Sequence, residues 1–269
     1  MAKTIVITSG KGGVGKTTST ANIGTALALN GKKVCLIDMD IGLRNLDVVL
    51  GLENRIIYDV IDVVEGRAKV HQALIKDKRF DDLLFLLPAA QHADKHAINP
   101  EQVKELVEEL DEFYDYILID SPAGIEQGFE NSIIAADEAI IITTPEISAI
   151  RDADRIVGIL EQRDIEPPKL VINRIRKEMM DTGDVMDIED ITRHLSLELL
   201  GIVYDDDEVV RTSNRGTPVV MNPDFDSSKG YRNIARRIVG ESVPLLTIKK
   251  EEENLPFWKR LFNFGQKDK

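Results

Sequence analysis

The sequence predicts an α/β fold, in which a doubly wound and mostly parallel sheet is flanked by helices in a single domain that ends in an amphipathic tail. Two patterns predict this fold. Short continuous apolar runs, typical of parallel strands buried on both faces, alternate with longer stretches of helical periodicity. A glycine-rich loop also joins the first apolar run to the first helical stretch.

The expected elements follow one another without repeats or low-complexity segments, and glycine and proline mark their ends. Asn30-Gly31 stops the first helix, Pro88 and Pro145 follow strands, and Pro100 begins a helix. The expected strands span residues 5–8, 34–37, 83–87, 116–120, 139–143, 169–173 and 200–203, and the expected helices span residues 17–29, 58–65, 100–113, 148–160, 187–195 and 227–239.

The composition is that of a soluble globular chain. The 269 residues are 43% hydrophobic and 30% charged, and the formal net charge is -13. An acidic surface repels nucleic acid, so no nucleic-acid partner is expected. The single cysteine, Cys35, cannot form an internal disulfide. No apolar stretch approaches the roughly 20 residues of a spanning helix, so a cytoplasmic location is expected.

The glycine-rich loop matches the phosphate-binding pattern G-x-x-x-x-G-K-[ST] from Gly10 to Thr17. Glycines let the backbone curl around an anion, and the following helix N-terminus also favours phosphate. Lys16 is expected to neutralise the outer phosphates and Thr17 to reach a magnesium ion. The expected nucleotide ligands in the loop are Gly10, Lys11, Gly12, Gly13, Val14, Gly15, Lys16, Thr17 and Thr18.

Lys11 is a second lysine in this loop, directly after its first glycine. The phosphates of one nucleotide are already served by Lys16 and the loop amides. Two interpretations therefore stay open from the residues alone. Lys11 is either a solvated surface charge or a ligand for a phosphate that a second subunit holds.

Carboxylates end two of the expected strands. Asp38 and Asp40 follow the second strand, and, being two residues apart, they share one side of an extended backbone. Asp120 ends a later strand and is followed by Gly124. An acid at the end of a strand downstream of a phosphate loop typically holds magnesium through water. A turn glycine there can place its amide near the terminal phosphate.

Asn173 ends the strand expected at residues 169–173, where its amide could bond the edge of a nucleotide base. GTPases follow this asparagine with Lys-x-Asp, whose carboxylate pairs with guanine. Here the following residues are Arg174-Ile175-Arg176, and the acid is missing. The sequence therefore favours adenine over guanine.

The C-terminal residues differ in character from the preceding 240. Residues 241–254 resemble an exposed linker, and residues 255–269 form an amphipathic segment with the chain's one tryptophan. The alternative is a terminal helix packed on the domain. One such tail binds a membrane weakly, whereas two tails on a dimer bind more tightly. The expected lipid contacts are Phe257, Trp258, Lys259, Arg260, Leu261, Phe262 and Phe264.

The loop with its additional Lys11 resembles the deviant Walker A motif of the MinD/ParA family of ATPases. Residues 38–47 and 120–126 resemble the two switch segments of this family, and the C-terminus resembles a membrane-targeting sequence. The resemblance implies an ATPase whose subunits dimerise on ATP, with Lys11 and Lys16 as catalytic groups and Lys11 crossing to the partner's phosphates. It further implies that Asp40 positions the attacking water. Asp38, Asp120 and Thr17 would then hold Mg²⁺, and Asn173 and Gly124 would contact the nucleotide.

The resemblance also implies partners. Residues 144–156 resemble the family's partner-binding helix, so Ser148, Arg151, Asp152 and Asp154 are expected to contact a partner. Charged residues on a helix face are otherwise explained by solvation alone. The implied role is placement of the bacterial division septum, as a peripheral protein on the inner face of the cell membrane. The implied partners are an anionic membrane surface, the division inhibitor MinC, and MinE or a DivIVA-linked positioning system.

Four other functions are alternatives to this role. An iron-protein reductase needs cluster cysteines, whereas Cys35 is alone. A DNA-partitioning ATPase of the same family needs a basic surface, which the net charge of -13 disfavours. A flagellar-number regulator of the family is a closer alternative. A protein that keeps ATP only as a structural ligand is disfavoured by the presence of both Lys11 and Asp40.

Overall fold

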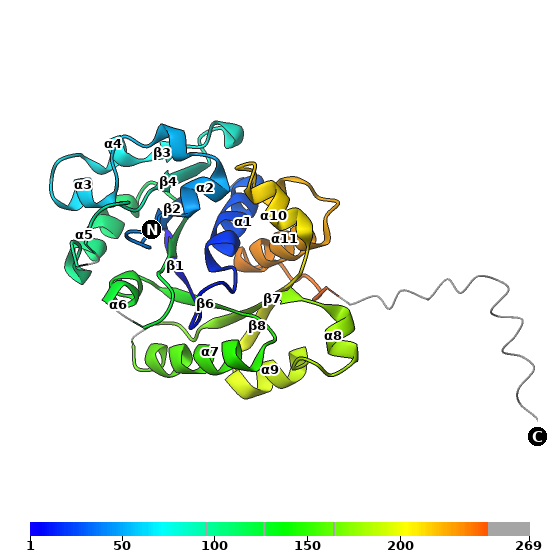
Figure 1. Cartoon of the computed structure of the whole chain (residues 1–269). Helices are drawn as coiled ribbons and strands as arrows, with labels where there is room; N and C mark the ends of the chain where they lie inside the picture. Colours follow the sequence, from blue (N-terminus) through cyan, green and yellow to red (C-terminus); the bar gives the residue numbers. More distant parts are fainter. Residues whose placement is uncertain (95, 126, 164, 247–269) are drawn as a thin grey trace, which may run out of the picture.

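A computed structural model describes residues 1–94, 96–125, 127–163 and 165–246 of the chain. Within them, the core is a single eight-stranded sheet in the order β3-β4-β2-β5-β1-β6-β7-β8 (Figure 1). Every neighbouring pair is parallel except β3–β4, which is antiparallel. The strands are β1 (Lys3–Thr8), β2 (Val34–Asp38), β3 (Ile75–Lys76), β4 (Leu84–Leu87), β5 (Tyr116–Asp120), β6 (Glu138–Thr143), β7 (Lys169–Ile175) and β8 (Glu198–Tyr204).

All seven predicted strands and all six predicted helices are present, so the predicted fold class is confirmed. The α-helices are α1 (Lys16–Leu29), α2 (Leu46–Leu50), α3 (Val60–Val64), α4 (Val70–Ala73), α5 (Pro100–Leu110), α6 (Gln127–Ile133), α7 (Ile147–Leu160), α8 (Lys177–Asp181), α9 (Ile188–Leu195), α10 (Asp207–Ser213) and α11 (Asp226–Ile238). Strand β3 and helices α2, α4, α6, α8 and α10 were not predicted as elements. Helix α2 begins at Leu46, within residues 38–47 that resemble a switch segment.

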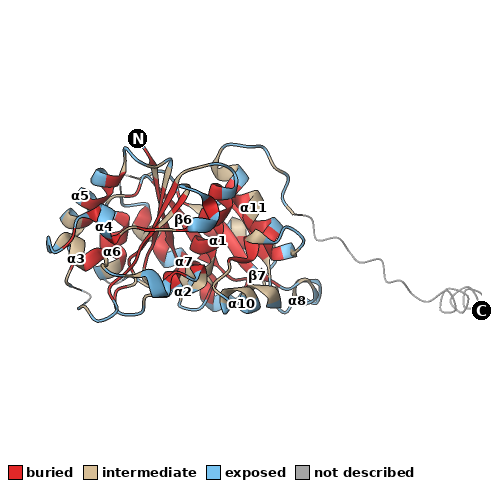
Figure 2. Cartoon of the chain, turned by 90° about the horizontal axis from the view of Figure 1, so that it is seen from above, coloured by how far each residue is buried: buried red, intermediate tan, exposed pale blue. Residues whose placement is uncertain are grey.

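The helices form two layers on opposite faces of the sheet (Figure 1), and the buried residues gather along the strands and the inner parts of the helices (Figure 2). Successive side chains of a strand point to opposite faces, so Ile5 and Ile7 of β1 join one apolar cluster and Val6 joins the other. The cluster that contains Ile5 is covered by α1, α2 and α11. The cluster that contains Val6 is covered by α3, α5, α6, α7 and α9. Burial on both faces explains why the strands read as continuous apolar runs.

The strand order reverses direction at β1, which lies between β5 and β6. In open α/β sheets, ligands bind outside the carboxyl ends of the strands at such a point. The loop that follows β1 is the glycine-rich loop of residues 9–15. The topology therefore places this loop between the strand ends that carry Asp38 and Asp120 and those that lead to α7 and Asn173.

The chain stays against the domain after α11, and Leu246 packs on the apolar cluster that contains Val6. Arg237 donates hydrogen bonds to the Leu200 and Val243 carbonyls and so holds residue 243 against β8. The predicted amphipathic tail and most of the predicted linker lie outside the described residues, and the domain boundary at residue 240 stays a prediction. Across the part of the chain that is described, no helix is both long and apolar enough to cross a membrane.

Glu138, the first residue of β6, joins β1 and β7 through two ion pairs that contribute to the stability of the sheet. Its carboxylate is 2% exposed and pairs with Lys3 at 2.5 Å and Lys169 at 2.9 Å. Burial by itself would raise its pKa, but the hydrogen bonds and charges of Lys169 and Lys3 outweigh burial and lower the pKa below its ordinary value. A lowered carboxylate pKa contributes stability above about pH 4.5, and this stability is lost as the pH falls through the folded-state value.

Glu138→Gln should lower the free energy of unfolding by about 1–3 kcal/mol at pH 7, because two part-exposed lysines lose their charged partner. The difference from the unmodified chain should shrink as the pH falls below about 4.5, because the unfolded chain then takes up a proton at Glu138 that the folded chain resists. Urea unfolding at pH 7 and pH 3.5 measures it, with Glu109→Gln on the exposed face of α5 as the control. Equal stability at pH 7, or an undiminished difference at pH 3.5, would contradict this role.

Candidate nucleotide-binding site

The glycine-rich loop turns from β1 into α1 through left-handed backbone conformations. Gly13 and Gly15 have φ angles of 82° and 92°, which residues with a side chain rarely adopt. Gly15 is the N-cap of α1, and its carbonyl accepts from the Ser19 amide at 2.8 Å. Val14 is buried, whereas Gly12 and Gly13 are exposed. The loop is therefore anchored at Val14 and open to solvent just before it.

Both ends of the loop are packed against other elements so closely that only glycine fits. A Cβ atom on Gly10 would lie 2.1 Å from the carbonyl oxygen of Asp152, on α7. A Cβ atom on Gly15 would lie 2.4 Å from Nδ2 of Asn173, in the C-terminal half of β7. The loop backbone is thus held between α7 and β7, and its conformation depends on where these two elements lie.

Lys16 lies in the first turn of α1 and is only 7% exposed. Its Nζ donates to Oδ1 of Asp120 at 2.8 Å, and the Thr20 hydroxyl donates to the same oxygen at 3.0 Å. Oδ2 of Asp120 is buried and has no hydrogen-bond partner among the described residues. Thr17 is the next residue of the helix and is half-buried. Lys16 is therefore paired with a carboxylate at the place where the sequence predicts phosphate.

Asp38 lies directly beside Asp120, because the β2–β5 register pairs the two residues across neighbouring strands. Asp38 is fully buried, and its carboxylate accepts the amides of Asp40 and Leu46 at 2.9 and 3.2 Å. Burial and, next, the charge of Asp120 raise its pKa to about 7, and the two amides and Lys16 oppose this rise. Two adjacent carboxylates with an unbonded buried oxygen are hard donors that suit Mg²⁺.

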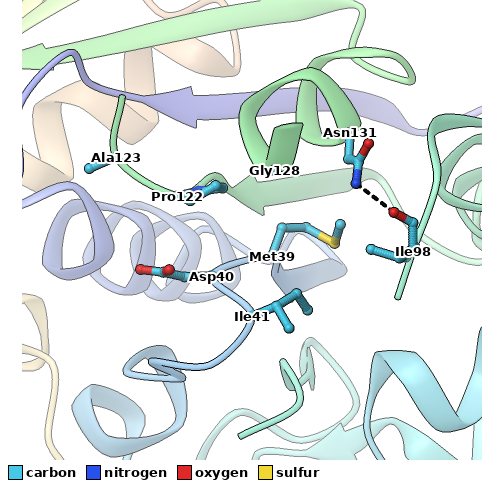
Figure 3. A pocket seen from close by; sticks show the side chains of 8 residues that line it. All are labelled: Met39, Asp40, Ile41, Ile98, Pro122, Ala123, Gly128 and Asn131. Carbon is cyan, nitrogen blue, oxygen red and sulfur yellow. Dashed lines mark hydrogen bonds between the residues drawn. The ribbon is translucent and has the colours of Figure 1, made fainter. Parts of the chain in front are cut away.

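Asp40 stays close to Asp38, because its amide donates to the Asp38 carboxylate at 2.9 Å. The expectation that the two side chains share one side of an extended backbone stays a prediction, because β2 ends at Asp38 and a turn begins at Asp40. The amides of Leu43 and Arg44 bond the Asp40 carbonyl within this turn. Asp40 is half-buried and lines a small cavity (Figure 3). The other lining residues are Met39, Ile41, Ile98, Pro122, Ala123, Gly128 and Asn131.

Gly124 lies in the segment after β5, next to Ala123, which lines the same cavity as Asp40. Its φ is 90°, and its amide donates to the Ser9 carbonyl at 3.2 Å. Ser9 is the residue that precedes Gly10. The segment after β5 is thus bonded directly to the beginning of the glycine-rich loop, next to the position predicted for the nucleotide phosphates.

Lys11 reaches the beginning of α7. Its Nζ donates to the Ser148 hydroxyl at 2.9 Å and lies 3.5 Å from a carboxylate oxygen of Glu146. The Lys11 side chain remains 40% exposed. Arg151 and Asp154 are exposed farther along α7 and Asp152 is half-buried, so the four predicted partner contacts lie in one helix that also contacts the loop.

A second pocket lies on the other side of the loop, next to the start of α1. It is lined by Gly15, Thr18, Asn173, Arg174, Tyr204, Asp205, Asp206, Val209, Val210 and Tyr231. Asn173 is 5% exposed, and its Nδ2 donates to the Val14 carbonyl at 2.8 Å. This amide therefore supports the loop backbone as well as lining the pocket. Apolar valines beside an amide and carboxylates form a surface that suits a nucleotide base.

Sequence reasoning missed several residues of this pocket. Arg174 takes a left-handed φ of 54°, and Tyr204 ends β8 just before Asp205 and Asp206. Tyr204, Asp205 and Asp206 could have been found from their position at the end of a strand, which is the same signal that identifies Asp38 and Asp120. The acidic run after β8 begins a helix, because Asp206 is the N-cap of α10.

Comparison with known proteins gives consistent matches over most of the chain. Residues 5–219 match the CobQ/CobB/MinD/ParA nucleotide binding domain family. The septum site-determining protein MinD of Bacillus subtilis is 65% identical over 256 residues, which cover 95% of this chain and 96% of that protein.

Two solved structures are also similar. One is a MinC:MinD cell division protein complex of Aquifex aeolicus, with a TM-score of 0.86 and 52% identity, covering 91% of this chain and 99% of that one. The other is MinD of Pyrococcus horikoshii complexed with Mg-ADP, with a TM-score of 0.80 and 29% identity, covering 88% and 96% of the two chains.

The raised pKa of Asp38 predicts how stability depends on pH when metal and nucleotide are absent. The folded chain keeps this proton between about pH 4 and pH 7, where the unfolded chain has released it. A raised carboxylate pKa therefore costs stability progressively as the pH rises across that range.

Asp38→Asn should raise the free energy of unfolding at pH 8 by about 1–3 kcal/mol and change it little at pH 4, because the variant has no charge to bury but loses one acceptor for the two amides. Urea unfolding in the presence of a chelator measures the difference. Asp181→Asn, at the exposed end of α8, is the control. A variant that is less stable at pH 8, or a gain that is equal at both pH values, would contradict the assignment.

Proposed function

Because the chain belongs to the MinD/ParA family of nucleotide-binding proteins, we propose that it is an ATP-hydrolysing switch that takes part in placing the bacterial division septum. The observation that carries this proposal is the meeting of Lys16 with two strand-end carboxylates. Asp38 and Asp120 are buried side by side, and Lys16 bonds one of them at the start of the glycine-rich loop. This is a site with one cation for phosphate and two acids for a metal.

We propose that ATP with Mg²⁺ is the ligand. Mg²⁺ would supply charge neutralisation on the phosphates, and Thr17, Asp38 and Asp120 would hold it, the acids through water. Lys16 would leave Asp120 for the phosphates, and the loop amides from Gly10 to Thr18 would surround them. Asp40, which lines the cavity between the two switch segments, would orient the attacking water. Such catalysis consists mainly of positioning and charge stabilisation.

The pocket beside the start of α1 would hold the adenine base, with Asn173 contributing its remaining amide oxygen. The Mg-ADP complex of the Pyrococcus horikoshii relative supports the nucleotide and the metal. The missing acid after Asn173 supports adenine over guanine. Gly124, already bonded to Ser9, would bring its segment close to the terminal phosphate.

Lys11 would complete a dimer that forms when ATP binds. In the isolated chain it is held by Ser148 and lies near Glu146, so it must leave α7 before it can reach a phosphate of a second subunit. The enzyme would consequently be slow as a monomer, because one of its cations arrives only with the partner. Lys11 is 40% exposed and so is accessible for this exchange.

The dimer would bind an anionic membrane through its two tails and recruit the division inhibitor MinC. The MinC:MinD complex of Aquifex aeolicus supports the MinC partnership. Ser148, Arg151, Asp152 and Asp154 would form part of the contact surface on α7. MinE or a DivIVA-linked system would position the protein, which would be a cytoplasmic protein bound peripherally at the inner face of the membrane.

Asp40→Asn should lower ATP turnover at least 100-fold and change the dissociation constant for ATP by less than about 3-fold, because the group acts on water and not on the phosphates. Phosphate release and fluorescence titration measure the two quantities in the full chain with lipid vesicles present. Asp181→Asn, exposed on α8, controls for loss of a surface acid. Turnover that remains within 3-fold of the unmodified protein would rule out this role of Asp40.

A further inference from the structure

Two turns that are distant in the sequence meet without any side chain between them. Gly51 follows α2 and Gly216 lies in the turn after α10, and both have left-handed φ angles, of 68° and 64°. A Cβ atom on Gly51 would lie 2.5 Å from the Gly216 carbonyl oxygen. A Cβ atom on Gly216 would lie 2.4 Å from the Gly51 Cα. The ends of α2 and α10 are therefore in direct backbone contact.

The guanidinium of Arg79 bridges this contact. It donates from Nη2 to the Leu50 carbonyl at 2.5 Å and from Nη1 to the Gly216 carbonyl at 3.0 Å. Leu50 is the last residue of α2, so the cation lies at the negative end of that helix. The remaining edge of the guanidinium donates to the carboxylate of Asp77, which is 2% exposed and accepts from Nε and Nη2 at 2.9 and 2.6 Å.

This arrangement needs arginine. A planar guanidinium can serve a carboxylate and two carbonyls in fixed directions, whereas a lysine ammonium is a single point. Arg79 is also fixed in place locally, because Asp77 accepts the Arg79 backbone amide at 3.0 Å and Arg79 lies over the Phe80 ring. The side chain is only 30% exposed. It therefore forms a rigid connection between α2 and α10.

The other ends of the two helices lie at the candidate nucleotide site. The Leu46 amide, at the start of α2, bonds Oδ2 of Asp38. Asp206, the N-cap of α10, lines the pocket assigned to the base together with Val209 and Val210. The helices have 5 and 7 residues, so they span roughly 7 and 10 Å. If α10 shifts when a base binds, the short connection between the two helices would displace α2 as well.

We propose that Arg79 is a positioning residue that couples occupation of the base pocket to the placement of α2 and of the Asp38 carboxylate that α2 holds. This inference rests on the proposed nucleotide-binding function. Its consequence is that a ligand with a base orders α2, and a ligand with phosphates alone does so less. Coupling between two sites through a shared rigid connection is reciprocal, so a metal held at Asp38 would in turn tighten base binding.

Amide hydrogen exchange in the full chain tests the coupling with two probes. Mg-ADP fills both the loop and the base pocket, whereas Mg-pyrophosphate fills the loop alone. In the unmodified protein, exchange of the Leu46–Leu50 amides should be about 5–10-fold slower with saturating Mg-ADP than with saturating Mg-pyrophosphate. In Arg79→Met the two ligands should protect α2 equally, and Arg79→Lys should recover part of the difference.

Arg211→Met is the matched control, because Arg211 is on the exposed face of α10 and pairs with Glu208. It should behave as the unmodified protein does. A ligand difference that persists in Arg79→Met would overturn the coupling and leave Arg79 a purely structural role. So would equal protection of α2 by the two ligands in the unmodified protein. Failure of the proposed function is distinguishable, because then neither ligand would protect the amides of residues 10–18 in any variant.

Discussion

The burial of two carboxylates next to each other is the constraint on which the rest of this site depends. Parallel pairing of β2 and β5 places Asp38 beside Asp120, and Lys16 bonds Asp120 at 2.8 Å. Lys16 cannot bond Asp120 and a phosphate with full strength at once. Binding of a phosphate would therefore leave the two acids to a different cation, which is the role proposed for Mg²⁺. The same burial raises the pKa of Asp38 to about 7.

The glycine-rich loop connects this site to α7 and to the base pocket. Gly10 touches the backbone of α7 at Asp152, and Gly15 touches Asn173 in the C-terminal half of β7. Lys11 adds a bond from the loop to Ser148 at the start of α7. A change in the loop conformation on phosphate binding would therefore displace α7, where partner contacts are proposed, and would also alter the base pocket. The geometry therefore supports a protein in which ligand binding at the loop changes the surface that contacts partners.

Much of this could be predicted from the sequence because the signals are local. Continuous apolar runs and helical periodicity predicted the strands of the sheet core and the longer helices, and the loop pattern located Lys16 and Thr17. The elements that were not predicted, such as α2 and α10, have 5 and 7 residues and so are too short to show periodicity. The bond from Asn173 to Val14 and the bond from Lys11 to Ser148 join residues far apart in the sequence and depend on tertiary packing, which no local pattern records.

The central claim is that nucleotide state controls attachment to a membrane. Co-sedimentation with vesicles containing anionic lipid, in ATP and in ADP, tests it most directly for the full chain and for a chain ending at residue 246. We predict that the full chain sediments at least 10-fold more in ATP than in ADP, because two weak tails act together in the dimer. The shortened chain should remain in the supernatant in both nucleotides. Sedimentation that ignores the nucleotide, or that survives removal of the tail, would contradict the account.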